Sequence, residues 1–134
     1  MENLENNDKP KVTLDFVELW GPRPTSIFNV IIDKERIGQC QVRHTPGKSE
    51  RMPEGFENHI YIEIDPEFRN QGFATQTLGL ALEEAKKIGL REVIVTVDLS
   101  NKASIKIIER NNGILLEEKP DKQGNLVRKY KIAL

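Results

Sequence analysis

Apolar and polar residues alternate along the first half of the chain, and this pattern predicts β-strands. A period of two over residues 12–16 is typical of a half-buried strand. Apolar stretches at 27–32 and 37–43 flank a short polar turn, which predicts a hairpin. Residues 60–64 form the next predicted strand, which ends at Asp65 and Pro66.

The period changes to a helical one at Ala74. Apolar residues recur on one face over 74–88, the pattern of an amphipathic helix, and Gly89 is placed to end it. The continuous apolar segment 93–97 predicts a strand that is covered on both faces.

The last third of the chain predicts a short helix and a terminal hairpin. Ser100 or Asn101 can cap a helix that runs to about residue 111. Strands at 114–118 and 126–134 flank a turn that contains Pro, Gly and Asn. Together the elements predict an α/β (α+β) domain in which two helices cover a mixed sheet.

Length and charge narrow the class of protein. The 134 residues suit one domain, which we expect over 12–134, with residues 1–11 as a flexible tail. Twenty Lys and Arg against 21 Asp and Glu do not indicate a nucleic-acid surface. No apolar run approaches the ~18 residues of a membrane span, and the polar, acidic N-terminus does not resemble a signal peptide. We therefore expect a cytoplasmic protein with no membrane or nucleic-acid partner, either a monomer or a homodimer.

The cysteine and histidine content argues against disulfide, redox and metal chemistry. The single cysteine, Cys40, excludes an internal disulfide and a CxxC site. Its strand-like surroundings favour a small core residue over a nucleophile. The two histidines lack HExxH or i, i+4 spacing, so no metal site is predicted.

Residues 69–74, Arg-Asn-Gln-Gly-Phe-Ala, carry the strongest chemical signal. A strand, a glycine-containing loop and a helix start place unpaired backbone N–H groups and the positive end of a helix dipole together, which favours phosphate. Gly72 allows close approach of a ligand, and Arg69 adds a charged donor. The alternative is a simple strand-to-helix turn that needs glycine for its geometry.

This segment resembles the Q/R-x-x-G-x-G/A pyrophosphate loop of the GNAT (Gcn5-related N-acetyltransferase) family, with Arg69, Gly72 and Ala74 at the defining positions. The predicted elements also follow the family's order. Further segments resemble a group of bacterial predicted acetyltransferases within the family: 42–45, His59-Ile60 with Pro66, 101–104 through 108–115, and 128–130.

The resemblance implies acetyl-CoA as co-substrate, with no metal. The CoA arm would lie where strands 60–64 and 93–97 splay apart, with its pyrophosphate on the loop and the Ile62 N–H polarising the thioester carbonyl. Asn101 and Ser104 would face the pantetheine, with helix capping as their alternative role. The implied CoA-binding residues are Ile62, Ile64, Arg69, Asn70, Gln71, Gly72, Phe73, Ala74, Thr75, Asn101 and Ser104.

The resemblance also implies a mostly antiparallel seven-stranded sheet with two main helices. Two departures from the family are visible in the sequence. The helices that usually join the first two strands are missing, because residues 19–26 can hold only a loop. The family's Tyr on the second helix, which protonates the leaving thiolate, is Ile108 here.

Four residues are candidates for proton transfer. His44 and His59 flank the long loop between two strands that pair antiparallel in the family, so they are expected near each other, with bonds to loop backbone as the alternative. Glu63 is a candidate base or an exposed sheet residue. Tyr130 is a candidate acid or a packing residue. Trp20, if it is not in the core, and Arg23 would line an acceptor pocket.

The sequence thus favours acetyl transfer from acetyl-CoA to a primary amine, without a covalent enzyme intermediate. Two alternatives remain open. One is a non-catalytic module that binds or senses acyl-CoA, which the absence of Tyr at position 108 would explain. The other is an interaction domain that uses the loop over residues 44–58.

Overall fold

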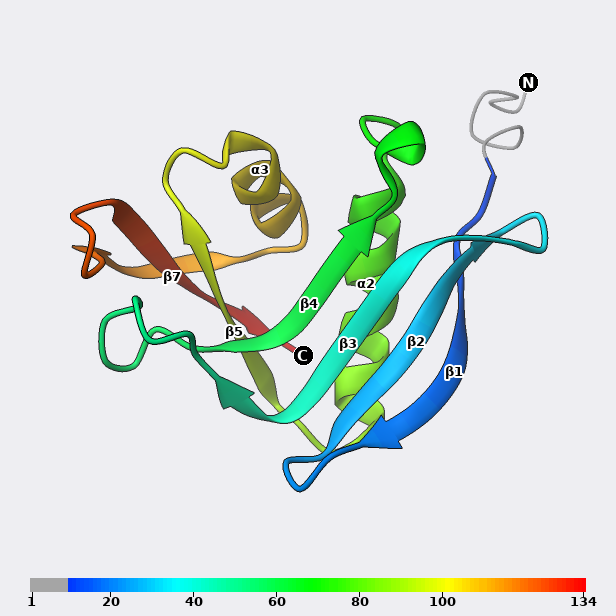
Figure 1. Cartoon of the computed structure of the whole chain (residues 1–134), viewed down its shortest axis with the longest axis horizontal. Helices are drawn as coiled ribbons and strands as arrows, with labels where there is room; N and C mark the ends of the chain where they lie inside the picture. Colours follow the sequence, from blue (N-terminus) through cyan, green and yellow to red (C-terminus); the bar gives the residue numbers. More distant parts are fainter. Residues whose placement is uncertain (1–9) are drawn as a thin grey trace.

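The computed structural model describes residues 10–134, which form seven strands and two α-helices (Figure 1). Residues 1–9, most of the expected tail, lie outside the described part of the chain. The strands of the first half are β1 (Thr13–Trp20), β2 (Thr25–Ile32), β3 (Glu35–Gly47) and β4 (Asn58–Ile64). The remaining elements are a 3-10 helix η1 (Pro66–Phe68), α2 (Phe73–Lys87), β5 (Glu92–Asp98), α3 (Lys102–Arg110), β6 (Ile114–Pro120) and β7 (Leu126–Ala133).

The strands form two sheets, ordered β1-β2-β3-β4 and β5-β7-β6, in which all paired neighbours are antiparallel. The predicted seven strands, mostly antiparallel pairing and two main helices are confirmed. The seven strands divide four and three, because no strand ladder joins β4 to β5. Only residues 21–24 connect β1 to β2, so the family's extra helices are absent, as the sequence predicted.

The register of the first sheet aligns apolar side chains beneath α2. Cys40 pairs with Phe28 on one side and Ile62 on the other, so the three lie on one face. Helix α2 buries Leu78 and Ala81 against the same core. Burial raises the pKa of Cys40 to about 12, so its thiol stays protonated and the predicted core role is confirmed.

Three local expectations are corrected. Strand β3 continues to Gly47, which shortens the long loop to residues 48–57. Trp20 is 59% exposed and therefore is not a core residue. Gln76 of α2 accepts a hydrogen bond from the Val12 N–H at 3.0 Å and donates one to the Pro10 carbonyl at 3.2 Å. The end of the expected tail is therefore attached to the helix.

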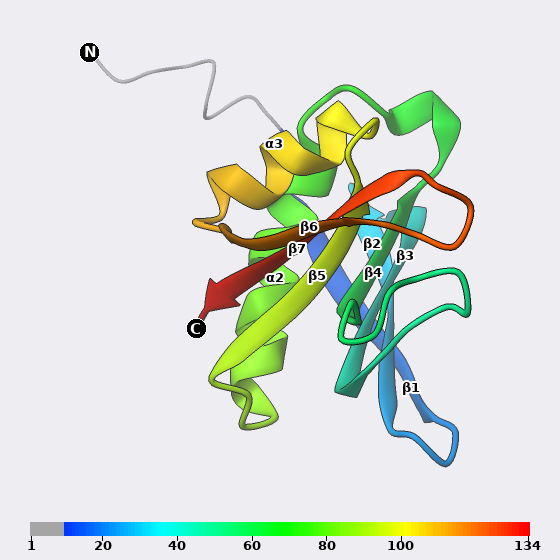
Figure 2. The same ribbon diagram turned by 90° about the vertical axis from the view of Figure 1, so that its left-hand side faces the viewer.

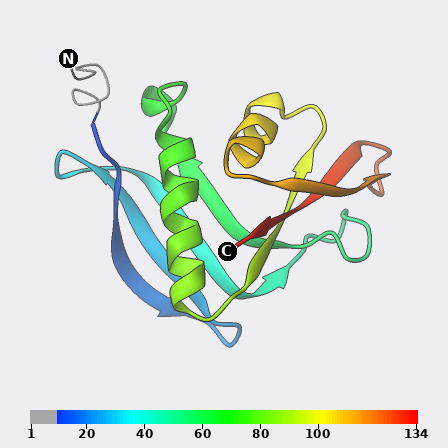
Figure 3. The same ribbon diagram turned by 180° about the vertical axis from the view of Figure 1, so that it is seen from behind.

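The two sheets meet where the start of β4 crosses the middle of β5, and the strands diverge from there, as the V between them in Figure 3 shows. Both helices lie on one side of the strands, and the loop over residues 48–57 lies on the other (Figure 2). Between residues 10 and 134, no helix is long and apolar enough to cross a membrane.

Candidate active site

Side chains, not a strand ladder, hold β4 and β5 together at the base of the V. Asn58 Oδ1 accepts a hydrogen bond from the Thr96 N–H at 2.8 Å, and His59 Nδ1 accepts one from the Ile94 N–H at 2.9 Å. The Thr96 hydroxyl donates to the Glu57 carbonyl at 3.1 Å. The β5 backbone is thereby satisfied without a pairing strand, and beyond this point the two strands are free to separate.

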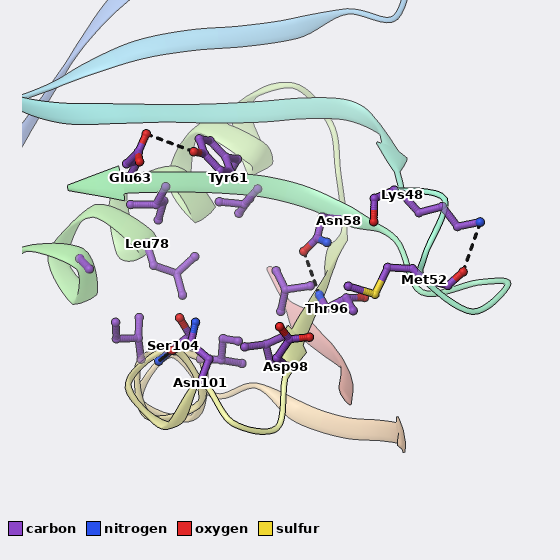
Figure 4. Close-up of a pocket in the computed structure, with 18 of the residues that line it drawn as sticks. Lys48, Met52, Asn58, Tyr61, Glu63, Leu78, Thr96, Asp98, Asn101 and Ser104 are labelled. Atoms are coloured by element: carbon purple, nitrogen blue, oxygen red, sulfur yellow. Dashed lines mark hydrogen bonds between the residues drawn. The ribbon is translucent and has the colours of Figure 1, made fainter. Parts of the chain in front are cut away.

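Between the diverging strands lies a cleft of about 870 Å³, a size that suits a cofactor arm and a small acceptor. Figure 4 shows Leu78 of α2 and Asn101 and Ser104 of α3 on its walls, with Asn58 and Thr96 at its base. Seven of the predicted site residues line it: Ile62, Glu63, Ile64, Arg69, Ala74, Asn101 and Ser104.

The backbone of β4 presents donors to this cleft. The Asp65 N–H donates to the Ile37 carbonyl at 2.8 Å, so this N–H points toward β3. N–H groups alternate in direction along a strand, so those of Ile62 and Ile64 point away from β3 and into the cleft. The geometry therefore gives both groups the direction that an oxyanion hole and an amide-binding edge require.

The N-terminus of α2 forms one end of the cleft. Gly72 adopts a left-handed conformation with φ 85° as the N-cap and supplies no side-chain cap, so the N–H groups of the first helical turn are free to bind a ligand. No acidic residue lies in that turn to compete for them. Arg69 donates from Nε to the Ile64 carbonyl at 2.8 Å, which holds its guanidinium beside the cleft. This end is suited to bind phosphate.

The α3 wall combines a helix cap with apolar surface. Asn101 Oδ1 accepts from the Ser104 N–H at 3.1 Å, so the capping alternative for Asn101 is confirmed. Both residues also line the cleft, as do Ile107 and Ile108. Position 108, where the family resemblance would place a tyrosine hydroxyl, thus presents the hydrocarbon side chain of Ile108 to the cleft.

His59 is buried at the junction, and its ring does not line the cleft. Burial lowers the pKa of His59, an effect that the negative charges of Glu57 and Glu92 partly oppose. The ring is therefore neutral at pH 7, and because Nδ1 accepts the Ile94 hydrogen bond, its proton resides on Nε2. No lone pair is free to take a proton from a substrate, which favours the structural alternative.

His44 and Tyr130 also lie outside the residues that line the cleft. His44 Nε2 lies 2.9 Å from Ser26 Oγ on β2, whereas His59 Nδ1 accepts a hydrogen bond from Ile94 on β5. The two rings are therefore bonded to different strands. Tyr130 is 1% exposed; its hydroxyl accepts from Arg128 at 3.0 Å and donates to Glu109 at 3.5 Å. These positions favour packing and local hydrogen bonding for both residues. Trp20 and Arg23, both exposed, do not line the cleft either.

Glu63 faces the cleft together with Tyr61, which the sequence analysis missed. The Tyr61 hydroxyl donates to Glu63 Oε1 at 3.2 Å (Figure 4). Partial burial, followed by the hydrogen bond to Glu63 and its charge, raises the pKa of Tyr61. The sequence could have indicated Tyr61, because residues i and i+2 of a strand share a face and Tyr61 is two residues before the candidate Glu63.

The opposite end of the cleft is closed by residues 48–57, which the sequence did not connect to any partner. Arg51 forms ion pairs with Asp98, at 3.3 Å, and with the buried Asp121 of the β6–β7 turn. The Lys122 N–H donates to the Arg51 carbonyl at 2.9 Å. In addition, Met52 packs in a small cluster with Phe56 and Val127. The loop over residues 48–57 is therefore joined to the sheet formed by β5, β6 and β7. Within residues 10–134, no group of three or more potential metal ligands comes together.

A sequence model of the acetyltransferase (GNAT) family matches residues 2–114. The chain belongs to the GNAT family. No curated protein matches it.

Solved structures share the fold. The spermidine/spermine N-acetyltransferase SpeG of Vibrio cholerae superposes with a TM-score of 0.68 at 16% identity, covering 92% of this chain and 94% of that one. A GNAT acetyltransferase of Streptococcus pneumoniae gives 0.62 at 17% identity, covering 82% of this chain and 66% of that one. The candidate acetyltransferase YncA of Salmonella typhimurium, solved with acetyl-CoA, gives 0.63 at 14% identity, with 82% and 65% coverage. The chain therefore spans less than two thirds of the length of the last two proteins.

The position of His59 leads to a prediction about stability. Because the folded-state pKa is lowered, the unfolded chain binds more protons as the pH falls below about 6.5, and stability is lost in that range. In His59→Asn, the amide oxygen retains an acceptor for the Ile94 N–H but does not titrate. We expect denaturation at pH 5 and pH 7.5 to show a smaller difference in the free energy of unfolding for His59→Asn than for the natural chain.

His59→Ala is the matched comparison, because it leaves the Ile94 N–H without a partner and should lose about 1–3 kcal/mol at pH 7.5. If kcat falls equally in both variants while CoA binding is unchanged, the catalytic assignment of His59 regains support.

Proposed function

We propose that the protein transfers an acetyl group directly from acetyl-CoA to a primary amine. The observation that carries the proposal is the cleft itself, in which the inward N–H groups of Ile62 and Ile64 lead to the uncapped N-terminus of α2. These backbone donors lie in one line, an arrangement that supports binding of the thioester carbonyl, the pantetheine amides and the pyrophosphate along the cleft. The family membership supports acetyl-CoA as the co-substrate.

In this proposal, CoA lies along β4 with its pyrophosphate on residues 69–75, including the N–H groups of Asn70, Gln71, Phe73 and Thr75. The Ile62 N–H stabilises the oxyanion that forms when the amine attacks the thioester. A fixed backbone donor needs no rearrangement during the reaction, which is why it lowers the barrier effectively.

Glu63 is the candidate that takes the proton from the amine. An alkyl ammonium has a pKa near ~10, so a neighbouring base is needed at pH 7. The Glu63 carboxylate lines the cleft one residue from Ile62, and the Tyr61 hydroxyl orients it at 3.2 Å. In contrast to Glu63, His44 and His59 are turned toward Ser26 and Ile94.

Tyr61 is the candidate that protonates the departing thiolate. Its raised pKa keeps the hydroxyl protonated at neutral pH, and it lines the cleft beside Ile62. Tyr130, the acid predicted from the sequence, is engaged with Arg128 and Glu109 instead. We therefore assign the acid to β4 rather than to β7.

The binding half of the proposal is tested at Gly72. A Cβ at this position meets no atom within 4 Å, so Gly72→Glu places a carboxylate in open space where the pyrophosphate would lie. Electrostatic repulsion and loss of close approach should weaken CoA binding by about tenfold or more, measured by calorimetry.

Gly89→Glu is the matched control, because Gly89 also has a positive φ, of 93°, and open surroundings, but lies at the other end of α2. The control accounts for the strain of a side chain in the left-handed region. Equal CoA affinity in folded Gly72→Glu and Gly89→Glu proteins would exclude the pyrophosphate assignment.

The proton acceptor is tested by Glu63→Gln. Loss of the carboxylate should lower kcat by about 100-fold or more, with CoA affinity unchanged. Asp15→Asn is the control: Asp15 belongs to the same row across the sheet, through Asn29 and Gln39, but does not line the cleft. Release of free thiol with a panel of amines is the assay, and a similar kcat for both variants argues against Glu63.

The proton donor is tested by the same chemical change at two positions. Tyr61→Phe should lower kcat by about 100-fold. Tyr130→Phe should leave kcat unchanged and reduce the free energy of unfolding by about 1 kcal/mol, because only a packed hydroxyl is lost. The reverse ranking of kcat would return the acid to Tyr130, and CoA binding without turnover of any amine would support a sensing module instead.

A further inference from the structure

The end of the cleft farthest from α2 is lined by cationic donors. Arg43 donates from one nitrogen to the Gly47 carbonyl at 3.3 Å, and Lys48 Nζ donates to the Met52 carbonyl at 3.4 Å. Neither forms an ion pair with an acidic residue in the described part of the chain. Most of the donor capacity of both side chains is therefore open to a ligand.

Asn58 adds a neutral donor at the same place. Its Oδ1 accepts from the Thr96 N–H, which fixes the orientation of the amide (Figure 4). The Nδ2 group is then the part of Asn58 that remains for a ligand, and it can only donate. Asn58 pairs with Gly47 across the ladder, so it lies beside the Arg43 and Lys48 segment.

The acidic residues of the cleft do not balance this end. Two carboxylates line the cleft, Asp98 and Glu63. Asp98 is paired with Arg51 at 3.3 Å, and Glu63 lies five residues along β4 from Asn58. The cleft therefore has cationic side chains without ion pairs at the Asn58 end and the carboxylate of Glu63 farther along β4.

The phosphates of CoA do not account for the cationic end. The phosphate-binding end is at Ile64, Arg69 and the start of α2. Asn58 is six residues from Ile64 on the same strand, a separation of roughly 20 Å. Arg43 and Lys48 thus lie on the acceptor side of Ile62.

We infer that the acceptor amine also carries a carboxylate, which binds Arg43, Lys48 and Asn58 while its amine lies beside Glu63. This rests on the proposed function, because it assumes that the thioester is at Ile62. A carboxylate offers only hydrogen-bond acceptors, which complements three donors, whereas the second ammonium of a polyamine offers only donors and meets like charges.

The test compares three acceptors of equal chain length. 8-Aminooctanoate, octylamine and 1,8-diaminooctane end in an anion, a methyl group and a cation, and their long chains suit the separation of Asn58 and Glu63, which are five residues or roughly 16 Å apart along β4. We expect kcat/KM, measured by release of free thiol, to be about tenfold or more higher for 8-aminooctanoate than for octylamine, with 1,8-diaminooctane the poorest.

A binding measurement makes the inference independent of turnover. Calorimetry with the CoA-loaded protein compares N-acetyl-8-aminooctanoate with N-acetyloctylamine, and the carboxylate should bind about tenfold or more tightly. Arg43→Gln and Lys48→Gln should each reduce this preference without changing CoA affinity. Arg36→Gln is the control, because Arg36 lies on the same strand but pairs with Asp65 outside the cleft.

Equal binding of the two acetylated compounds, or a preference that survives both Arg43→Gln and Lys48→Gln, overturns the inference even if the protein is an active acetyltransferase. Conversely, loss of CoA binding only in Gly72→Glu, together with turnover that shows no carboxylate preference, supports the proposed function and rejects the carboxylate.

Discussion

Two backbone N–H groups of β5 donate hydrogen bonds to side chains of β4 instead of to a neighbouring strand. The rest of the site depends on this replacement of strand pairing by side-chain hydrogen bonds. A buried backbone donor needs a partner, and in a continuous sheet the neighbouring strand supplies it. Here Asn58 and His59 supply it for Thr96 and Ile94, over the short stretch where the strands touch. Within residues 10–134, strands β4 and β5 are thereby held together only over this short stretch, and their natural twist separates them beyond it. The cleft is the space that this separation opens.

The separation also exposes the free edge of β4. An edge strand normally carries unpaired N–H and C=O groups that invite association with another strand. In this protein the edge lies inside the V, with α2 and α3 on its walls, so the N–H groups of Ile62 and Ile64 are available to a ligand but protected from another chain. The structural cost of an unpaired edge and the capacity to bind an extended cofactor arm are therefore the same feature.

The sequence predicted the elements well because their signals are local. The change of period at Ala74 and the glycine-containing segment before it located α2 and the end of the cleft proposed to bind phosphate, and every predicted strand exists. The histidines were harder to interpret, because their partners Ser26 and Ile94 lie 18 and 35 residues away. Similarly, no local pattern connects Arg51 to Asp121, 70 residues later. The separation of the sheets was also not predictable, since it depends on which side chains replace a ladder.

The ion pairs of Arg51 have a mechanical consequence. Without these ion pairs, the two sheets could rotate relative to each other about the contact between β4 and β5. Arg51 connects the loop from β3 and β4 to the end of β5 and to the β6–β7 turn, and the cluster of Met52, Phe56 and Val127 adds a second connection. These contacts oppose a change in the angle between the two sheets. If the proposed cofactor binds, little of its binding free energy would then be needed to close the protein around it.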